Sequence, residues 1–77
     1  MDEILSVLYG IVAYQLDVDR DKLNENSRFD ELHADDIDVI EIILAAEDEF
    51  DVEVPDELMM SFDTIGSLAA YLSKIID

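Results

Sequence analysis

The segment DIDVIEIILAAEDEFD, residues 36–51, decides the fold that this sequence predicts. Its apolar residues recur at the spacing of one helical face, and acidic residues fall between them. Asp35 or Asp36 would cap this helix, because short acidic side chains accept hydrogen bonds from the free N–H groups of a first turn. The apolar stripe that we expect to face a core consists of Ile37, Ile40, Ile43, Leu44 and Phe50.

Helices are also expected on both sides of this segment. Residues 2–16 carry apolar positions at helical spacing, and a last helix opens near Asp63 or Thr64, both good caps. Residues 52–55 should be extended, because the residue before a proline avoids helix, and a short helix over about 56–61 would follow. The sequence therefore predicts a single all-α domain over residues 1–77, a small antiparallel four-helix bundle with three long helices and one short one.

A long loop, residues 17–35, separates the first two helices. It is rich in Asp, Asn and Ser, and a loop of this length in a small domain is usually functional or partly ordered. We expect scattered apolar residues to anchor it to the core, namely Val18, Leu23, Phe29 and Leu32. The three tyrosines, Tyr9, Tyr14 and Tyr71, are expected to be partly buried.

Charge restricts the partners. The 77 residues contain 21 Asp and Glu against 4 Lys and Arg, which gives a formal net charge of −17. Nucleic acids and anionic membrane surfaces need cationic groups, so neither is an expected partner, whereas basic protein patches are. No apolar run approaches membrane-spanning length, so we expect no membrane insertion. We further expect the protein to be a monomer located in the cytoplasm.

Catalysis and specific metal binding find little support. The chain has no Cys, which excludes disulfides, thiolate zinc sites and Cys nucleophiles. A calcium loop starting at Asp17 fails, because Lys22 and Arg28 stand where Gly and a bidentate Glu are needed. His33, the only His, lies near Asp35, but no nucleophile, base and oxyanion donor come together in the sequence. We expect neither an enzyme nor a metal site, and only weak divalent binding by the acids of helix 36–51.

Several motifs resemble the acyl carrier protein family. LHADDIDVIE (32–41), EDEF (47–50) and VPDE (54–57) are similar to its pattern of Leu-Gly-Ala-Asp-Ser-Leu-Asp, then Glu-Leu, Glu-Glu-Glu-Phe and Ile-Pro-Asp-Glu. The resemblance extends to QLDV (15–18) and DTIG (63–66), and so covers essentially the whole chain. Two departures stand out, which are Asp36 in place of the family's Ser and His33 in place of its Gly.

The resemblance implies a role in fatty-acid or polyketide-type biosynthesis. The family attaches 4′-phosphopantetheine to the Ser that Asp36 replaces, so the chain as written should not be loadable there and should carry no cofactor. Basic patches of synthases, acyltransferases and pantetheinyl transferases would dock on the matching acids, Asp35, Asp38, Glu41, Glu47 and Asp48. An acyl chain would be sheltered by Ile40, Leu44, Val54, Phe62 and Leu68.

Asp36 has two interpretations that the sequence leaves open. It is either an engineered replacement that holds a carrier in an unmodified form or a natural divergence. The alternative to a carrier scaffold is a noncatalytic docking or regulatory protein, which binds a basic partner through helix 36–51. Residues 30–63 support this alternative, since they contain 14 acids and no Lys or Arg.

Overall fold

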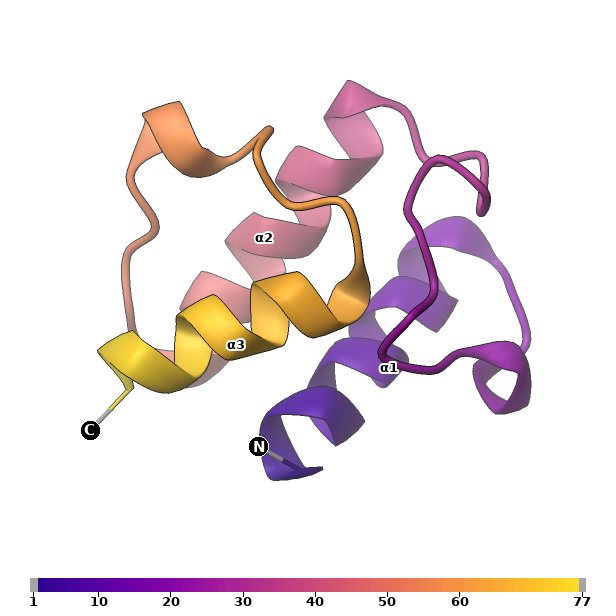
Figure 1. Cartoon of the computed structure of the whole chain (residues 1–77), viewed down its shortest axis with the longest axis horizontal. Coiled ribbons are helices and arrows are strands. Elements are labelled where there is room, and N and C mark those ends of the chain that lie inside the picture. Colours follow the sequence, from indigo (N-terminus) through magenta and orange to yellow (C-terminus); the bar gives the residue numbers. More distant parts are fainter. Residues whose placement is uncertain (1, 77) are drawn as a thin grey trace.

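The computed structural model describes residues 2–76, which form three α-helices joined by two long connections (Figure 1). A short 3₁₀ turn interrupts each connection. The elements in chain order are α1 (Asp2–Leu16), η1 (Arg20–Lys22), α2 (Asp36–Phe50), η2 (Asp56–Leu58) and α3 (Ile65–Ile75). The prediction of an all-helical fold is confirmed for these residues. No helix among them is long and apolar enough to cross a membrane.

The predicted fourth helix over about 56–61 is a single 3₁₀ turn, η2, so a count of four α-helices is not confirmed. Pro55 precedes the turn, and its carbonyl accepts a hydrogen bond from the Leu58 N–H at 2.9 Å. No side chain caps it. A single uncapped turn forms too few hydrogen bonds to offset the backbone entropy that is lost when further residues become helical.

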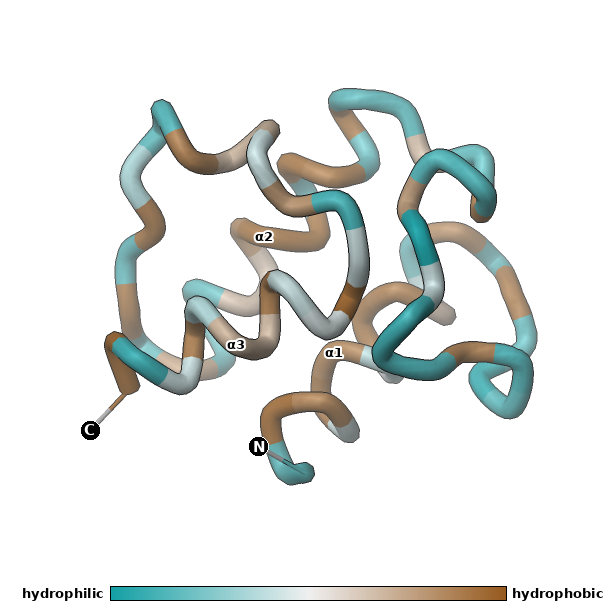
Figure 2. The backbone as a smooth tube through the Cα atoms, in the orientation of Figure 1, coloured by the Kyte–Doolittle hydropathy of each residue, from teal (hydrophilic) through white to brown (hydrophobic). Residues whose placement is uncertain are grey.

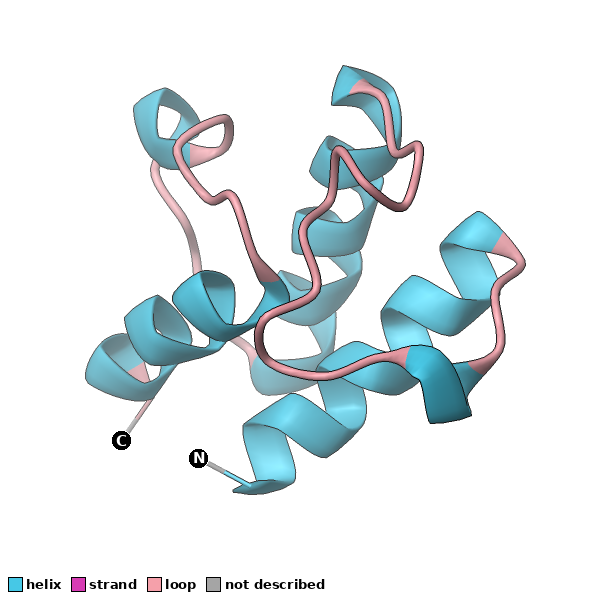
Figure 3. Ribbon diagram, turned by 45° about the vertical axis from the view of Figure 1, so that its right-hand side comes forward, coloured by secondary structure: helices cyan, strands magenta, loops and turns pink. Residues whose placement is uncertain are grey.

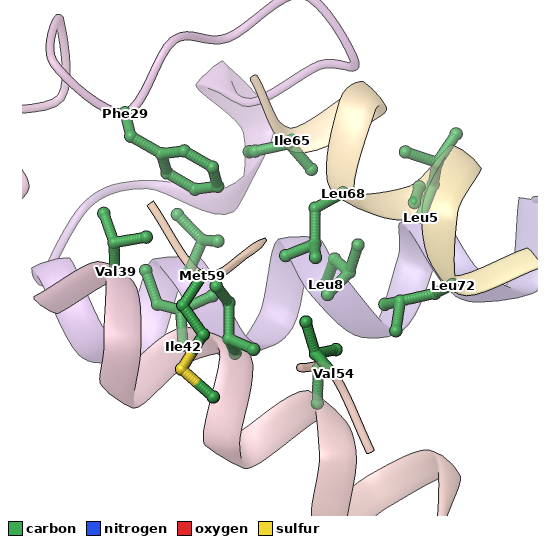
Figure 4. Close-up of a cluster of buried hydrophobic side chains, with 14 of the residues drawn as sticks. Leu5, Leu8, Phe29, Val39, Ile42, Val54, Met59, Ile65, Leu68 and Leu72 are labelled. Atoms are coloured by element: carbon green, nitrogen blue, oxygen red, sulfur yellow. The ribbon is translucent and has the colours of Figure 1, made fainter. Parts of the chain in front are cut away.

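The helix α1 packs against both other helices. Its first residues lie at the same end of the molecule as the last residues of α2 and α3 (Figure 3). Fully buried side chains from all three helices fill the space between them, including Leu8, Ile42 and Leu68 (Figure 4). Val54 and Met59, from the connection before α3, complete this core.

The predicted apolar stripe of α2 was wrong at two positions. Ile37 is 66% exposed and Leu44 is 48% exposed. The buried face instead consists of Val39, Ile42, Ile43 and Ala46. Apolar residues occupy nearly every position from 37 to 46, so the segment contains two overlapping helical stripes. Contact with α1 buries one of them and leaves the other in solvent.

The loop between α1 and α2 is mostly hydrophilic, with isolated hydrophobic residues along it (Figure 2). Leu23 and Phe29 are buried, as predicted, while Val18 and Leu32 are partly buried. Backbone hydrogen bonds also tie the loop to the start of α3. The N–H of Ile65 donates to Ser27 O at 3.1 Å, and the N–H of Gly66 donates to Glu25 O at 2.9 Å.

The tyrosines do not behave alike. Tyr9 and Tyr71 are partly buried, as expected, and the Tyr71 ring lies 5.5 Å from that of Phe62. The expectation was wrong for Tyr14, which is 90% exposed. The buried face of α1 contains Leu5, Leu8 and Val12, and Tyr14 projects from a different side of the helix.

Candidate functional site

The N-terminus of α2 presents Asp36 as its first helical residue, with an exposed side chain. A reciprocal pair of hydrogen bonds fixes this end of the helix. Asp35 Oδ1 accepts from the Asp38 N–H at 2.9 Å, and Asp38 Oδ2 accepts from the Asp35 N–H at 3.2 Å. Such a capping box satisfies two otherwise unpaired donors, and it holds position 36 at the helix start. Asp35 is therefore the cap.

Beside Asp36 lies a small hollow of about 160 Å³. Its apolar lining comes from the loop, from α2 and from the segment before α3. The contributing residues are Phe29, Ala34, Val39, Met60 and Phe62, with Arg28, Asp30 and Asp63 as polar neighbours. The position of Asp36 thus opens onto a partly apolar recess of a few water volumes.

Arg28 and Asp30 form the only ion pair found within residues 2–76, with Nε and Oδ1 3.1 Å apart. The hydrogen bond from Arg28 lowers the pKa of the Asp30 carboxyl below its usual value. A lowered pKa means that the pair is intact at neutral pH and is lost only as the pH falls through the pKa of Asp30. The acids of α2 therefore have no cationic partner in the described part of the chain.

The five acids predicted to dock partners are placed in different environments. Asp35 and Asp38 form the capping box. Glu41 is exposed and accepts a 2.6 Å hydrogen bond from Gln15 Nε2 of α1. Glu47 is partly buried, and its carboxylate accepts a hydrogen bond from the Val54 N–H, while Asp48 is exposed.

A docking ridge, which we define as Ile37, Glu41, Leu44 and Asp48, runs along the exposed side of α2. These residues follow one another at helical spacing, and each is exposed. Two of them, Ile37 and Leu44, were predicted to face the core, but they lie exposed beside the acids. Dividing the apolar positions of α2 into two separate helical stripes could have predicted that these two side chains are exposed.

The five residues predicted to shelter an acyl chain do not all face the interior. Val54 and Leu68 are buried, Ile40 and Phe62 are partly buried, and Leu44 lies on the docking ridge. Only Phe62 among them lines the hollow beside Asp36.

His33 is exposed and has a positive φ of 64°. Its backbone N–H donates to Asp30 O at 3.2 Å, and no hydrogen bond of its imidazole is found among the described residues. A left-handed conformation costs a residue with a Cβ roughly 1 kcal/mol, and glycine avoids that cost. The substitution of His for Gly therefore leaves the turn before α2 in place but strained.

We expect His33→Gly to raise the free energy of unfolding by about 0.5 kcal/mol, because relief of strain exceeds the added entropy of the unfolded chain. Thermal melting followed by circular dichroism measures this as a Tm increase of about 2–4 °C. His33→Ala is the control, since it removes the imidazole but keeps the Cβ. An equal gain in His33→Ala would show that backbone strain is not the cause.

The serine hydroxyls lie elsewhere. All five form hydrogen bonds within the chain, and none stands at the start of α2. Ser6 Oγ accepts from Arg20, for example, and Ser67 belongs to the capping box of α3. No group of three or more His, Asp or Glu within residues 2–76 is arranged to hold a metal ion.

Comparison with known proteins agrees with this geometry. A family model described as a phosphopantetheine attachment site matches residues 6–72. The acyl carrier protein of Bdellovibrio bacteriovorus is 43% identical over 65 residues, covering 83% of each chain. Those of Lactobacillus acidophilus (38% identical, covering 95% of this chain and 92% of the relative) and Caulobacter vibrioides (36% identical, covering 96% of each) match over more of their length.

The fold and matched region place the chain in the class of helical carrier domains whose family model is described as a phosphopantetheine attachment site. The chain belongs to the acyl carrier protein family. Members of this family are carriers rather than enzymes, which confirms the prediction that the chain is not an enzyme. They carry 4′-phosphopantetheine as a prosthetic group, and they interact with synthases and transferases.

The side chain at position 36 does not fit that prosthetic group. Attachment requires a hydroxyl that forms a stable phosphodiester, and Asp36 provides a carboxylate. A carboxylate bonded to the same phosphorus would give a labile acyl phosphate. The neighbouring residues supply no replacement, because the serine hydroxyls lie elsewhere.

Proposed function

We propose that this chain is an acyl carrier scaffold of fatty-acid or polyketide-type biosynthesis that is not loadable with 4′-phosphopantetheine at position 36 as written. One observation supports the proposal above all others. Asp36 occupies the exposed first position of α2, behind an intact capping box and beside a partly apolar hollow. Everything at this end of the helix suits an attachment site except the side chain itself.

Incubation with coenzyme A and a promiscuous phosphopantetheinyl transferase tests this proposal. The chain as written should keep its mass, and Asp36→Ser should gain the mass of one arm. If several transferases leave a folded Asp36→Ser variant unmodified, the proposal that the chain is an acyl carrier scaffold is contradicted.

We further propose that an acyl chain shelters between the helices, against Ile40, Leu44, Val54, Phe62 and Leu68. Ile40 and Phe62 are partly buried and pack against the buried core, so small movements of these side chains would open space for an acyl chain beside the core. The exposed Leu44 would contact a chain only at the outer edge of such a shelter, because it also belongs to the docking ridge.

A second proposal concerns docking. The docking ridge combines two exposed acids with two exposed apolar side chains, and no cation of the described chain pairs with those acids. Unbalanced like charges on one helix repel one another and reduce its stability. Such a surface is therefore better explained by binding of a basic partner than by a role in stabilising the fold. We propose that the chain is a monomeric single domain that docks basic patches of synthases, acyltransferases or pantetheinyl transferases here. A noncatalytic regulatory protein would use the same ridge.

Replacing Glu41 and Asp48 together by Lys should weaken binding to a basic partner by tenfold or more, about 1.4 kcal/mol. Surface plasmon resonance with an immobilised synthase or transferase measures the effect, and it should shrink as salt is raised. Glu53→Lys with Glu57→Lys is a matched control, since it makes the same charge change at two exposed residues outside α2. Equal losses in both double variants would show that net charge, rather than the ridge, directs binding.

A further inference from the structure

Two adjacent methionines, Met59 and Met60, are placed in opposite environments. They are the central residues of a turn, which is closed by a hydrogen bond from the Ser61 N–H to Leu58 O at 3.0 Å. Met59 is 8% exposed and lies among the core side chains that Figure 4 shows. Met60 is 52% exposed. The turn therefore directs one methionine side chain into the core and the other to the surface.

Met60 is also part of the hollow beside position 36. It lines this hollow together with the apolar side chains of Val39 and Phe62, and Arg28 contributes a polar group to the same lining. Met59 is not part of that lining. A small molecule that reaches the hollow from solvent therefore meets the side chain of Met60, whereas the core encloses that of Met59.

The sulfur chemistry of this chain belongs to methionine alone. The sequence contains three Met and no Cys, and Met1 lies outside the described residues. The thioether sulfur attacks the hydroxyl oxygen of a hydroperoxide, the O–O bond breaks, and the hydroxyl proton moves to the departing oxygen, which leaves as water or an alcohol. Sulfur loses two electrons and the peroxide gains two, so the step needs no further reactant. Its rate depends on how freely the peroxide reaches the sulfur.

We propose that Met60 is a site of reversible oxidation by hydroperoxides in the folded protein, and that its sulfoxide makes the hollow beside position 36 more polar without unfolding the chain. The oxidation converts an apolar side chain into a polar one. Because Met60 is at the surface, the new oxygen stays in contact with water, and the core around Met59 keeps its packing. Methionine sulfoxide reductases reverse the change.

The first test is treatment of the folded chain with hydrogen peroxide, followed by tandem mass spectrometry that locates each added oxygen. We expect Met60 to be oxidised about tenfold faster than Met59. In urea, where both side chains are exposed, the two rates should become equal, because the difference comes from the fold. Met60→Leu should lose this early oxygen, and Met59→Leu, a volume-conserving core substitution, should keep it.

The second test uses the isotope-labelled chain in which Met60 is oxidised and Met59 is not. Amide shifts should extend beyond the neighbours of Met60 in sequence to Phe29 and Ala34, which line the same hollow. The Tm should change by less than about 3 °C, since the core is untouched. Treatment with methionine sulfoxide reductases should restore the original mass and spectrum.

Three results would overturn the proposal. They are equal oxidation rates of Met59 and Met60 in the folded chain, amide shifts confined to residues 58–62, and loss of the folded spectrum when Met60 alone is oxidised. None of these outcomes depends on loading at position 36 or on docking of a partner.

Discussion

Gly66→Ala should lower the free energy of unfolding by about 2–3 kcal/mol, although alanine is the better helix former. Gly66 lies in the first turn of α3, where the loop crosses it. A Cβ there would stand 2.6 Å from Glu25 O and 3.1 Å from Glu25 Cβ. The same oxygen accepts the hydrogen bond from the Gly66 N–H at 2.9 Å, so the loop cannot move away without losing it.

Thermal melting measures the loss as a Tm decrease of about 8–20 °C. Gly10→Ala is the matched control, because its Cβ would meet only a movable side-chain end, and its Tm should stay the same or rise. If Gly66→Ala melts at or above the Tm of the parent chain, the loop does not pack on α3 as described.

This contact is an example of a structural feature that the sequence alone does not predict. The helices of this chain follow from local signals, such as apolar spacing and the caps Asp35 and Thr64. The contact of Gly66 with Glu25 joins residues far apart in sequence, and no local pattern reports it. The only sign of this contact in the sequence is that residue 66 is a glycine.

The candidate site was predicted in part. The position of Asp36 at the start of α2 came from the motif around it, and the structure places it there. The exposure of Ile37 and Leu44 was not predicted, because a nearly continuous apolar run does not tell which side another helix will cover. The hydrogen bond from the Val54 N–H to the Glu47 carboxylate was not predicted either, because it depends on how the chain turns after α2.

Restored loading of Asp36→Ser is the second large effect that we expect. The substitution supplies the hydroxyl at the exposed first position of α2 and leaves the capping box of Asp35 and Asp38 untouched. A transferase that docks on α2 would therefore find its nucleophile in the expected place. The effect is a change from no modification to complete modification, which exceeds any graded change in affinity.

Asp35→Ser is the sharpest control for this substitution. Serine caps helices as well as aspartate does, so the fold should persist, but the hydroxyl then stands one residue before the attachment position. A variant that combines Asp36→Ser with Glu41→Lys and Asp48→Lys should load more slowly, because it keeps the hydroxyl and loses the acids of the docking ridge.

The most direct test of the account is the intact mass of these proteins after incubation with coenzyme A and a promiscuous phosphopantetheinyl transferase. We predict that the chain as written and Asp35→Ser keep their masses, whereas Asp36→Ser gains one phosphopantetheine arm. Gain of the arm by the chain as written, or no gain by folded Asp36→Ser with several transferases, would contradict the account.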